Sequence, residues 1–184
     1  CSERVFYRPF VYLMMNKPSG VLSASEDRGG AVTAADLVAG EYAHYRVSPA
    51  GRLDKDSEGF LILTNDGDYI HQVISPAKHV SKRYFCSLEH EISEADIAAF
   101  ENGILLADGF LCRPAVLERG VPGRDAPGPS AFVTIQEGKF HQVKRMFAAR
   151  ANKVLALKRV RIGGVCLDAS LAPGEYREMT EEEK

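Results

Sequence analysis

The sequence lacks the features that mark a membrane or secreted protein. Its apolar runs fall short of the roughly 18 residues that a membrane span needs, and its first residues, Cys1-Ser2-Glu3-Arg4, are not those of a signal peptide. Its four cysteines lie far apart without a Cys-x-x-Cys pair, which gives no support to a disulfide framework or a zinc knuckle. We expect a soluble, cytoplasmic protein, with Cys86 and Cys112 reduced and in or beside the core.

The sequence also lacks the common motifs of cofactor and hydrolytic sites. No Gly-x-Ser-x-Gly elbow, Gly-x-x-x-x-Gly-Lys-Ser/Thr phosphate loop or Gly-x-Gly-x-x-Gly dinucleotide motif occurs. The five histidines show no His-Glu-x-x-His spacing. The acidic run 54–59 matches the first half of a calcium-binding EF-hand loop, but Asn65 stands where the bidentate Glu is needed. We therefore expect neither a metal nor another cofactor.

Charge is distributed unevenly along a chain whose formal net charge is only −2. Between Lys139 and Arg161 there are eight Lys or Arg, together with His141 and no acidic residue. The segment 175–183 carries five Glu instead. A basic stretch on a near-neutral protein fits a polyanionic partner that contacts one side. A solvated helix face is the alternative that the charges alone leave open.

Short apolar runs separated by turn residues predict an α+β fold. We expect a mixed, mainly antiparallel sheet with flanking helices, because the strands alternate irregularly with short helices. Thr33 and Ser93 are expected to cap helices, and Gly103 is expected to end one in the left-handed conformation. The predicted strands are 11–15, 60–64, 84–88, 111–117, 131–136 and 154–162, the predicted helices are 31–38, 68–74, 93–103 and 141–152, and 120–129 is predicted to be an exposed, mobile loop.

The most informative segment is a charged loop followed directly by an apolar strand. The loop reads Gly51-Arg52-Leu53-Asp54-Lys55-Asp56-Ser57-Glu58-Gly59, and the strand is 60–64. A rigid strand in this position can aim loop side chains into a cleft. An ordinary acidic turn is the alternative that these residues leave open.

Several motifs, in this order along the chain, resemble those of the RsuA-like pseudouridine synthases. The resemblance extends from Phe10 to Glu182. It implies one pseudouridine synthase catalytic domain over residues 1–184, with two joined lobes around a central cleft. The motifs are Met15-Asn16-Lys17-Pro18-Ser19-Gly20, Gly51-Arg52-Leu53-Asp54, Thr64-Asn65-Asp66-Gly67, Lys82-Arg83-Tyr84, Gly138-Lys139-Phe140-His141-Gln142-Val143-Lys144-Arg145-Met146, Arg161-Ile162-Gly163-Gly164 and Leu171-Ala172-Pro173-Gly174-Glu175-Tyr176-Arg177.

The resemblance also implies roles for individual residues. Asp54 would be the catalytic carboxylate, and Lys144 would pair with it and keep it ionised in a desolvated cleft. Tyr84 would lie against a flipped uridine, as a stacking surface and a candidate for proton transfer. Arg52 would reach a neighbouring phosphate or take the place of the flipped nucleotide. The substrate-binding residues would be Arg52, Leu53, Lys82, His141, Gln142, Arg145 and Leu157, with Leu157 as an apolar wall. Phosphates would be contacted by Lys78, Lys82, Arg83, Arg145 and the other basic residues of 139–161.

The implied reaction is the cofactor-free isomerisation of a uridine in ribosomal RNA to pseudouridine. The segments 113–118 and 171–177 look most like the small-subunit branch, which favours 16S rRNA, either naked or in a ribosomal assembly intermediate. A 23S uridine, and a noncatalytic RNA-binding or ribosome-assembly factor on the same scaffold, are the alternatives. Members of the family usually carry a small RNA-binding module ahead of this domain, which is expected to be absent or outside this chain. We expect a monomer.

Overall fold

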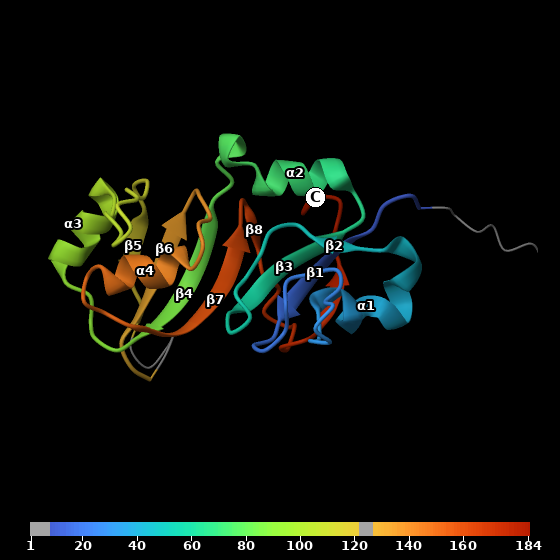
Figure 1. Ribbon diagram of the computed structural model, residues 1–184, viewed down its shortest axis with the longest axis horizontal. Helices are drawn as coiled ribbons and strands as arrows, with labels where there is room; N and C mark the ends of the chain where they lie inside the picture. Colours follow the sequence, from blue (N-terminus) through green and yellow to red (C-terminus); the bar gives the residue numbers. More distant parts are fainter. Residues whose placement is uncertain (1–7, 122–126) are drawn as a thin grey trace, which may run out of the picture.

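The fold is built around one mixed sheet (Figure 1), which the computed structural model describes for residues 8–121 and 127–184. All strand pairings are antiparallel except that of β3 with β7, so the predicted sheet type is confirmed. Across the sheet the strands are β5 (Val116–Arg119), β6 (Ser130–Ile135), β4 (Lys82–Leu88), β7 (Val154–Ile162), β3 (Glu58–Thr64), β1 (Tyr12–Lys17) and β9 (Tyr176–Glu178), with β2 (Ser48–Pro49) on β3 and β8 (Val165–Cys166) on β7.

The helices that flank the sheet begin where the sequence places capping residues. Thr33 and Ser93 each accept a hydrogen bond from the backbone N–H three residues later, and the Asp at that position accepts one in return. Both predicted caps are therefore confirmed. In the described residues the helices are α1 (Ala34–Tyr42), α2 (Gly67–Ile74), α3 (Glu94–Asn102) and α4 (Gln142–Ala148), with the 3-10 turns η1 (Ala43–Tyr45) and η2 (Pro76–Lys78). None of these helices has the length and apolar character that crossing a bilayer requires.

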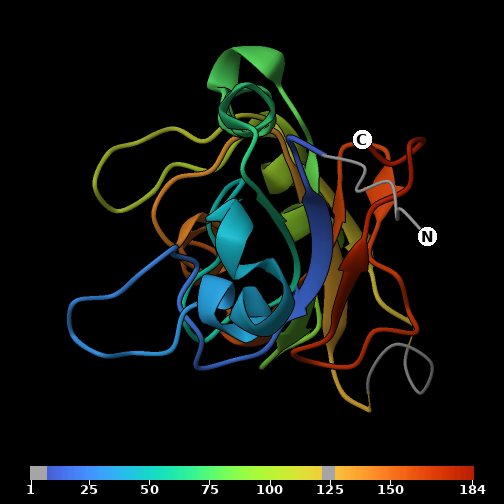
Figure 2. The ribbon, with the colours of Figure 1, turned by 90° about the vertical axis from the view of Figure 1, so that its right-hand side faces the viewer.

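Helices α1 and α2 cover opposite faces of β1 and β3. Neighbouring residues of a strand point to opposite faces, and the strands are apolar on both. Leu13 and Leu61 pack in one cluster with Val38 of α1, whereas Met14 and Ile62 pack in another with residues of α2. In Figure 2, α2 is the green helix at the top of the view, and α1 is the light-blue helix lower down.

A third apolar cluster fills the other half of the molecule, where α3 and α4 pack on β4, β6 and β7. Phe100 of α3 and Phe147 of α4 pack against each other in it, with ring centroids 5.1 Å apart. Cys86 and Cys112 are buried in this cluster, as predicted. Leu53, from the loop before β3, also packs into it. That loop therefore links the two halves.

The two halves join at the parallel pair β3–β7, where Gly59 lies opposite Arg159. Parallel strands begin at the same edge of a sheet, so the loop before β3 and helix α4 before β7 meet there. Gly59 has a φ of 103°, and a Cβ atom at this position would lie 2.2 Å from the Arg159 carbonyl oxygen. Only glycine allows the strands to approach this closely.

The sequence predicted β7 residue for residue, and four other strands with ends shifted by at most two residues. The predicted strand 111–117 is wrong in its first half: the ladder spans Val116–Arg119, and Leu111 makes only an isolated bridge to Leu105. Gly103 has a positive φ of 90° but a ψ of 136°, which is not the expected left-handed cap. The predicted mobile loop 120–129 lies partly outside the described residues.

The predicted helix 141–152 is also too long, because α4 ends at Ala148. Ala151 has a φ of 53°, and the Asn152 N–H turns back to the Phe147 carbonyl. A left-handed alanine is uncommon, since glycine or asparagine normally takes this position. The sequence therefore gave no cue for the end of the helix.

Gly59→Ala tests the junction. We expect it to lower the free energy of unfolding by more than about 2 kcal/mol, because both the positive φ and the close carbonyl oppose a Cβ atom. Urea titration measures this loss. Gly67→Ala, at a position with no atom within 4 Å of a Cβ, is the matched control and should leave stability unchanged or raise it by up to about 1 kcal/mol. Equal stabilities of the two variants would contradict the account.

Candidate active site

Asp54 lies on the loop that links the two halves of the molecule. The backbone of Leu53, directly before it, is fixed on both sides: the Ser23 hydroxyl donates to the Leu53 carbonyl at 3.0 Å and accepts from its N–H at 3.0 Å. The Asp54 side chain is 25% exposed. A pocket of about 400 Å³ opens beside it, lined by Ser19, Gly20, Asp54, Lys55, Asp56 and His141. The predicted catalytic carboxylate therefore faces an opening in the surface.

Two basic side chains from the start of α4 approach Asp54. Lys144 Nζ lies 3.6 Å from Asp54 Oδ2, and His141 Nε2 lies 3.4 Å from Asp54 Oδ1. Lys144 is closer to Asp56, and donates to its two carboxylate oxygens at 2.7 and 2.8 Å. This hydrogen bond lowers the pKa of the Asp56 carboxyl below its usual range. The structure thus brings Lys144 to Asp54 and adds Asp56, a partner that the sequence reasoning missed.

Lys17 is a second residue whose position the sequence reasoning missed. It ends β1 fully buried, and its Nζ donates to the carbonyls of Val21 at 2.7 Å, Pro18 at 2.9 Å and Lys55 at 3.4 Å. Burial lowers its pKa to about 8. The amine ties together the two loops that line the pocket. A lysine directly after an apolar strand, within Asn16-Lys17-Pro18, was the available cue.

Arg159 supports the same loop from β7. It is 3% exposed, and its guanidinium donates to the carbonyls of Phe60 at 2.8 Å and Arg52 at 3.3 Å. For Arg159 the expected contact with phosphate is therefore wrong, because its side chain is inside the molecule. The sequence of β7 could not distinguish Arg159 from the exposed basic residues, because the alternation of side chains along a strand does not show which face of the sheet a loop covers.

Tyr84 and Leu157 lie in the apolar cluster that also holds Leu53. Tyr84 is 8% exposed, and Leu157 and Leu53 are each 7% exposed. The structure therefore brings these three predicted site residues together, in the core next to the Asp54 loop. Their contact with a substrate stays a prediction.

Gln142 and Arg145 of α4 hold the turn that precedes the helix. The buried Gln142 amide donates to Glu137 at 2.7 Å and accepts from the Lys139 N–H at 2.8 Å. Arg145 is ion-paired with Asp108 and donates to a backbone carbonyl of the turn. In this structure both side chains position the turn.

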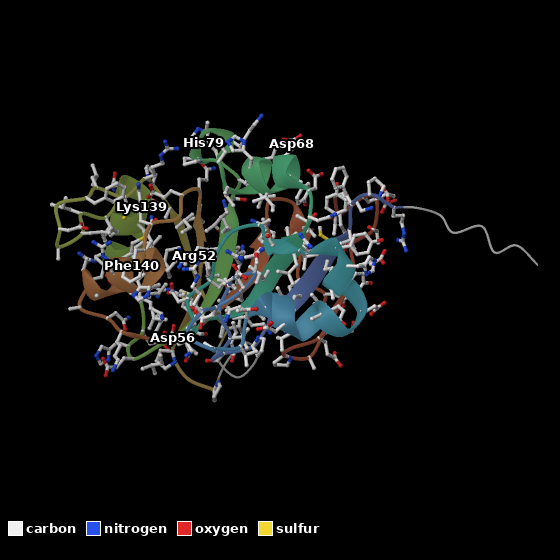
Figure 3. All side chains as sticks on the ribbon, turned by 45° about the vertical axis from the view of Figure 1, so that its right-hand side comes forward. Arg52, Asp56, Asp68, His79, Lys139 and Phe140 are labelled. Atoms are coloured by element: carbon white, nitrogen blue, oxygen red, sulfur yellow. The ribbon has the colours of Figure 1, made fainter. Side chains whose placement is uncertain are left out.

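The remaining two predicted residues lie apart from these contacts. Lys82 is half-buried and donates to the Val73 carbonyl at 3.2 Å, and burial lowers its pKa. Arg52 is exposed, and its side chain has no hydrogen-bond partner in the part of the chain that the structure describes. Figure 3 labels it to the right of Phe140 and above Asp56.

The site can therefore present an anionic carboxylate, flanked by two basic groups, to a ligand in the pocket. Such a group can act as a nucleophile, as a base, or as a counter-charge to a cationic centre. In the described residues, no three His, Cys, Asp or Glu side chains come together as metal ligands would.

Comparisons with protein families, with curated proteins and with solved structures all match this chain to pseudouridine synthases. Residues 11–149 match the family described as RNA pseudouridylate synthase. The "Uncharacterized RNA pseudouridine synthase YtzG" of Bacillus subtilis is 51% identical over 182 residues, which are 99% of this chain and 75% of that protein. The "Ribosomal small subunit pseudouridine synthase A" of Escherichia coli K12 is 42% identical, over 94% of this chain and 71% of that protein. A crystal structure of a pseudouridylate synthase superposes with a TM-score of 0.84 and 40% identity, over 95% of this chain and 72% of that one.

Lys17→Met tests whether the buried amine titrates as the structure indicates. Its pKa is lowered from 10.5 to about 8 in the folded protein. Between these two values the unfolded chain binds more protons than the folded one, so the contribution of Lys17 to the unfolding free energy rises with pH. The advantage of the wild type over Lys17→Met should therefore grow, by up to roughly 3 kcal/mol, across this window.

Urea titrations at pH values from 7 to 10.5 measure the difference between the two proteins at each pH. Taking the difference cancels the titration of other groups. Lys153→Met, which removes an exposed lysine, controls for the loss of one positive charge. A difference between wild type and Lys17→Met that does not change with pH would contradict the buried position of the amine.

Proposed function

The chain belongs to the RNA pseudouridylate synthase family, as an RsuA-like member, and from this premise we propose that it converts a uridine of 16S ribosomal RNA to pseudouridine with Asp54 as the catalytic carboxylate. Family membership makes it an isomerase that acts on RNA. The choice of 16S RNA is supported by the similarity to the Escherichia coli protein whose name specifies the small ribosomal subunit.

The position of Asp54 carries the proposal. It is the partly exposed carboxylate of the pocket that lies within 3.6 Å of Lys144 and 3.4 Å of His141, in the segment that matches the family. Asp56 is a weaker candidate because both of its oxygens already accept hydrogen bonds from Lys144. Lys144 stabilises the ionised form of Asp54 when a bound nucleotide excludes water.

The reaction moves the uracil ring from one attachment to another. The bond from the sugar C1′ to N1 breaks, and its electron pair stays on the ring. The Asp54 carboxylate faces C1′ and stabilises the positive charge there, by electrostatics or by bonding to it. The ring turns and C5 bonds to C1′, and the proton lost from C5 is balanced by one gained at N1. Water is not consumed.

The uridine must leave the RNA stack to reach Asp54, which costs unstacking energy. The flipped base meets the edge of the cluster formed by Leu53, Tyr84 and Leu157, with Tyr84 as the candidate for proton transfer. The exposed cations Arg52 and Lys139 contact phosphates beside it. The protein works as a monomer in the cytoplasm, on naked 16S RNA or an assembly intermediate.

Asp54→Asn tests the catalytic assignment. Replacing the carboxylate by an amide of the same shape removes the negative charge, so we expect the rate of pseudouridine formation in 16S RNA to fall by at least about 10²-fold. RNA binding should stay within about twofold of wild type, because phosphate contacts dominate affinity. Asp68→Asn, an exposed aspartate in the first turn of α2, is the matched control and should keep full activity.

The same assay, run on separate 16S and 23S RNAs with pseudouridines mapped by mass spectrometry, tests the substrate. Modification of one 16S uridine by wild type is the expected result. Modification of 23S RNA alone would refute the small-subunit assignment. RNA binding without product from either RNA or from assembly particles would instead support a noncatalytic role.

A further inference from the structure

Phe140 is the most exposed large apolar side chain in the described residues, with 76% of its surface accessible. Its ring stacks on that of His141, with centroids 3.7 Å apart and an interplanar angle of 19°. Side chains of adjacent residues normally diverge. Here His141 has a φ of 49°, a left-handed conformation that non-glycine residues rarely adopt. The turn therefore keeps two aromatic rings face to face at the surface.

The turn that carries this pair is held firmly. Gln142 bonds to Glu137 and to the Lys139 backbone, at 2.7 and 2.8 Å. The Gln142 N–H donates to the Lys139 carbonyl at 3.1 Å, and Arg145 donates to the Phe140 carbonyl at 3.4 Å. An exposed aromatic on a fixed backbone loses little conformational freedom when a ligand covers it. The large exposure of Phe140 is thus not the result of a loose loop.

The stacked pair adjoins the Asp54 pocket. His141 lines that pocket, and its Nε2 lies 3.4 Å from Asp54 Oδ1. One face of the Phe140 ring is covered by His141, so the opposite face accounts for the exposure. No other ring or cation stacks on that face among the described residues. Figure 3 shows Phe140 and Lys139 to one side of Arg52 and Asp56. A flat, apolar, open face next to a nucleotide pocket matches a nucleobase.

We propose that the Phe140–His141 pair is a stacking platform for a second base of the RNA, the one adjacent to the uridine that enters the Asp54 pocket. The proposal rests on the proposed function, because it takes RNA as the ligand. Stacking on an aromatic ring is tolerant of base identity. The platform therefore holds the strand open beside the flipped uridine without reading the sequence of its neighbour.

The test measures binding in the Asp54→Asn background, so that affinity is obtained without turnover. The probe is a fluorescently labelled 16S RNA fragment that contains the uridine modified by wild type. Phe140→Leu keeps an apolar side chain but removes the ring, and should weaken binding roughly 5- to 150-fold, the range that base–aromatic stacking spans. Phe140→Tyr keeps the ring and should bind within about twofold of Phe140.

RNAs with a single abasic nucleotide on either side of the target uridine identify the contact. At one of the two positions, the proteins with Phe140 and with Phe140→Leu should bind equally, because the base that stacks is gone. Val116→Ala, which shortens an exposed side chain on the edge strand β5, is the control and should leave every affinity unchanged. Equal thermal midpoints show that the variants are folded.

The platform is refuted if Phe140→Leu binds the intact RNA within twofold of its parent, or if its defect is the same with both abasic RNAs. These outcomes are independent of catalysis. If wild-type protein forms no pseudouridine in any RNA, the proposed function fails instead, and the binding comparison is then made with a single-stranded, uridine-containing 16S fragment that the Asp54→Asn protein binds.

Discussion

The ammonium group of Lys144, placed between two carboxylates, is the interaction on which the site depends. Asp54 and Asp56 come from the loop before β3, and Lys144 comes from α4, 88 residues later in the chain than Asp56. The contact therefore forms only where the two halves of the molecule join. The parallel pairing of β3 and β7, with Gly59 against Arg159, brings the loop and the helix to one edge. Sheet geometry thus sets the distance between the cation and Asp54.

Two further basic side chains lie inside the molecule, where they donate hydrogen bonds to the backbone near Asp54. Lys17 and Arg159 are buried, and each offsets its desolvation by donating to backbone carbonyls, those of the loops around Asp54 and, for Arg159, also that of Phe60 in β3. A catalytic loop held in this way keeps its geometry before substrate arrives. The turn that carries the exposed Phe140 is likewise held by side-chain hydrogen bonds, those of Gln142 and Arg145.

Much of this could be predicted from the sequence, and the failures have physical causes. The caps at Thr33 and Ser93 and the β-branched residues of β7 are local signals, and they were placed correctly. The end of α4 was missed because it depends on a left-handed Ala151. The strands β2, β8 and β9 span only two or three residues, too few for a periodic pattern.

The candidate site, too, was predicted only in part from the sequence. The family motifs pointed to Asp54 and Lys144, which the structure brings to 3.6 Å. They did not show that Asp56 takes the shorter contacts with the lysine, because which of two nearby carboxylates a side chain reaches depends on loop geometry. Nor did they separate the buried Lys17 and Arg159 from surface cations, since burial of a basic residue is decided by distant segments that cover it.

The most direct measurement is the single-turnover rate of pseudouridine formation by Lys144→Met, compared with Lys144→Arg, each at saturating RNA. If the shared cation keeps Asp54 competent, the methionine variant should lose at least about 10²-fold, as expected for the loss of one preorganised electrostatic partner, while the arginine variant recovers a measurable part of the rate. A methionine variant as fast as wild type would contradict the account.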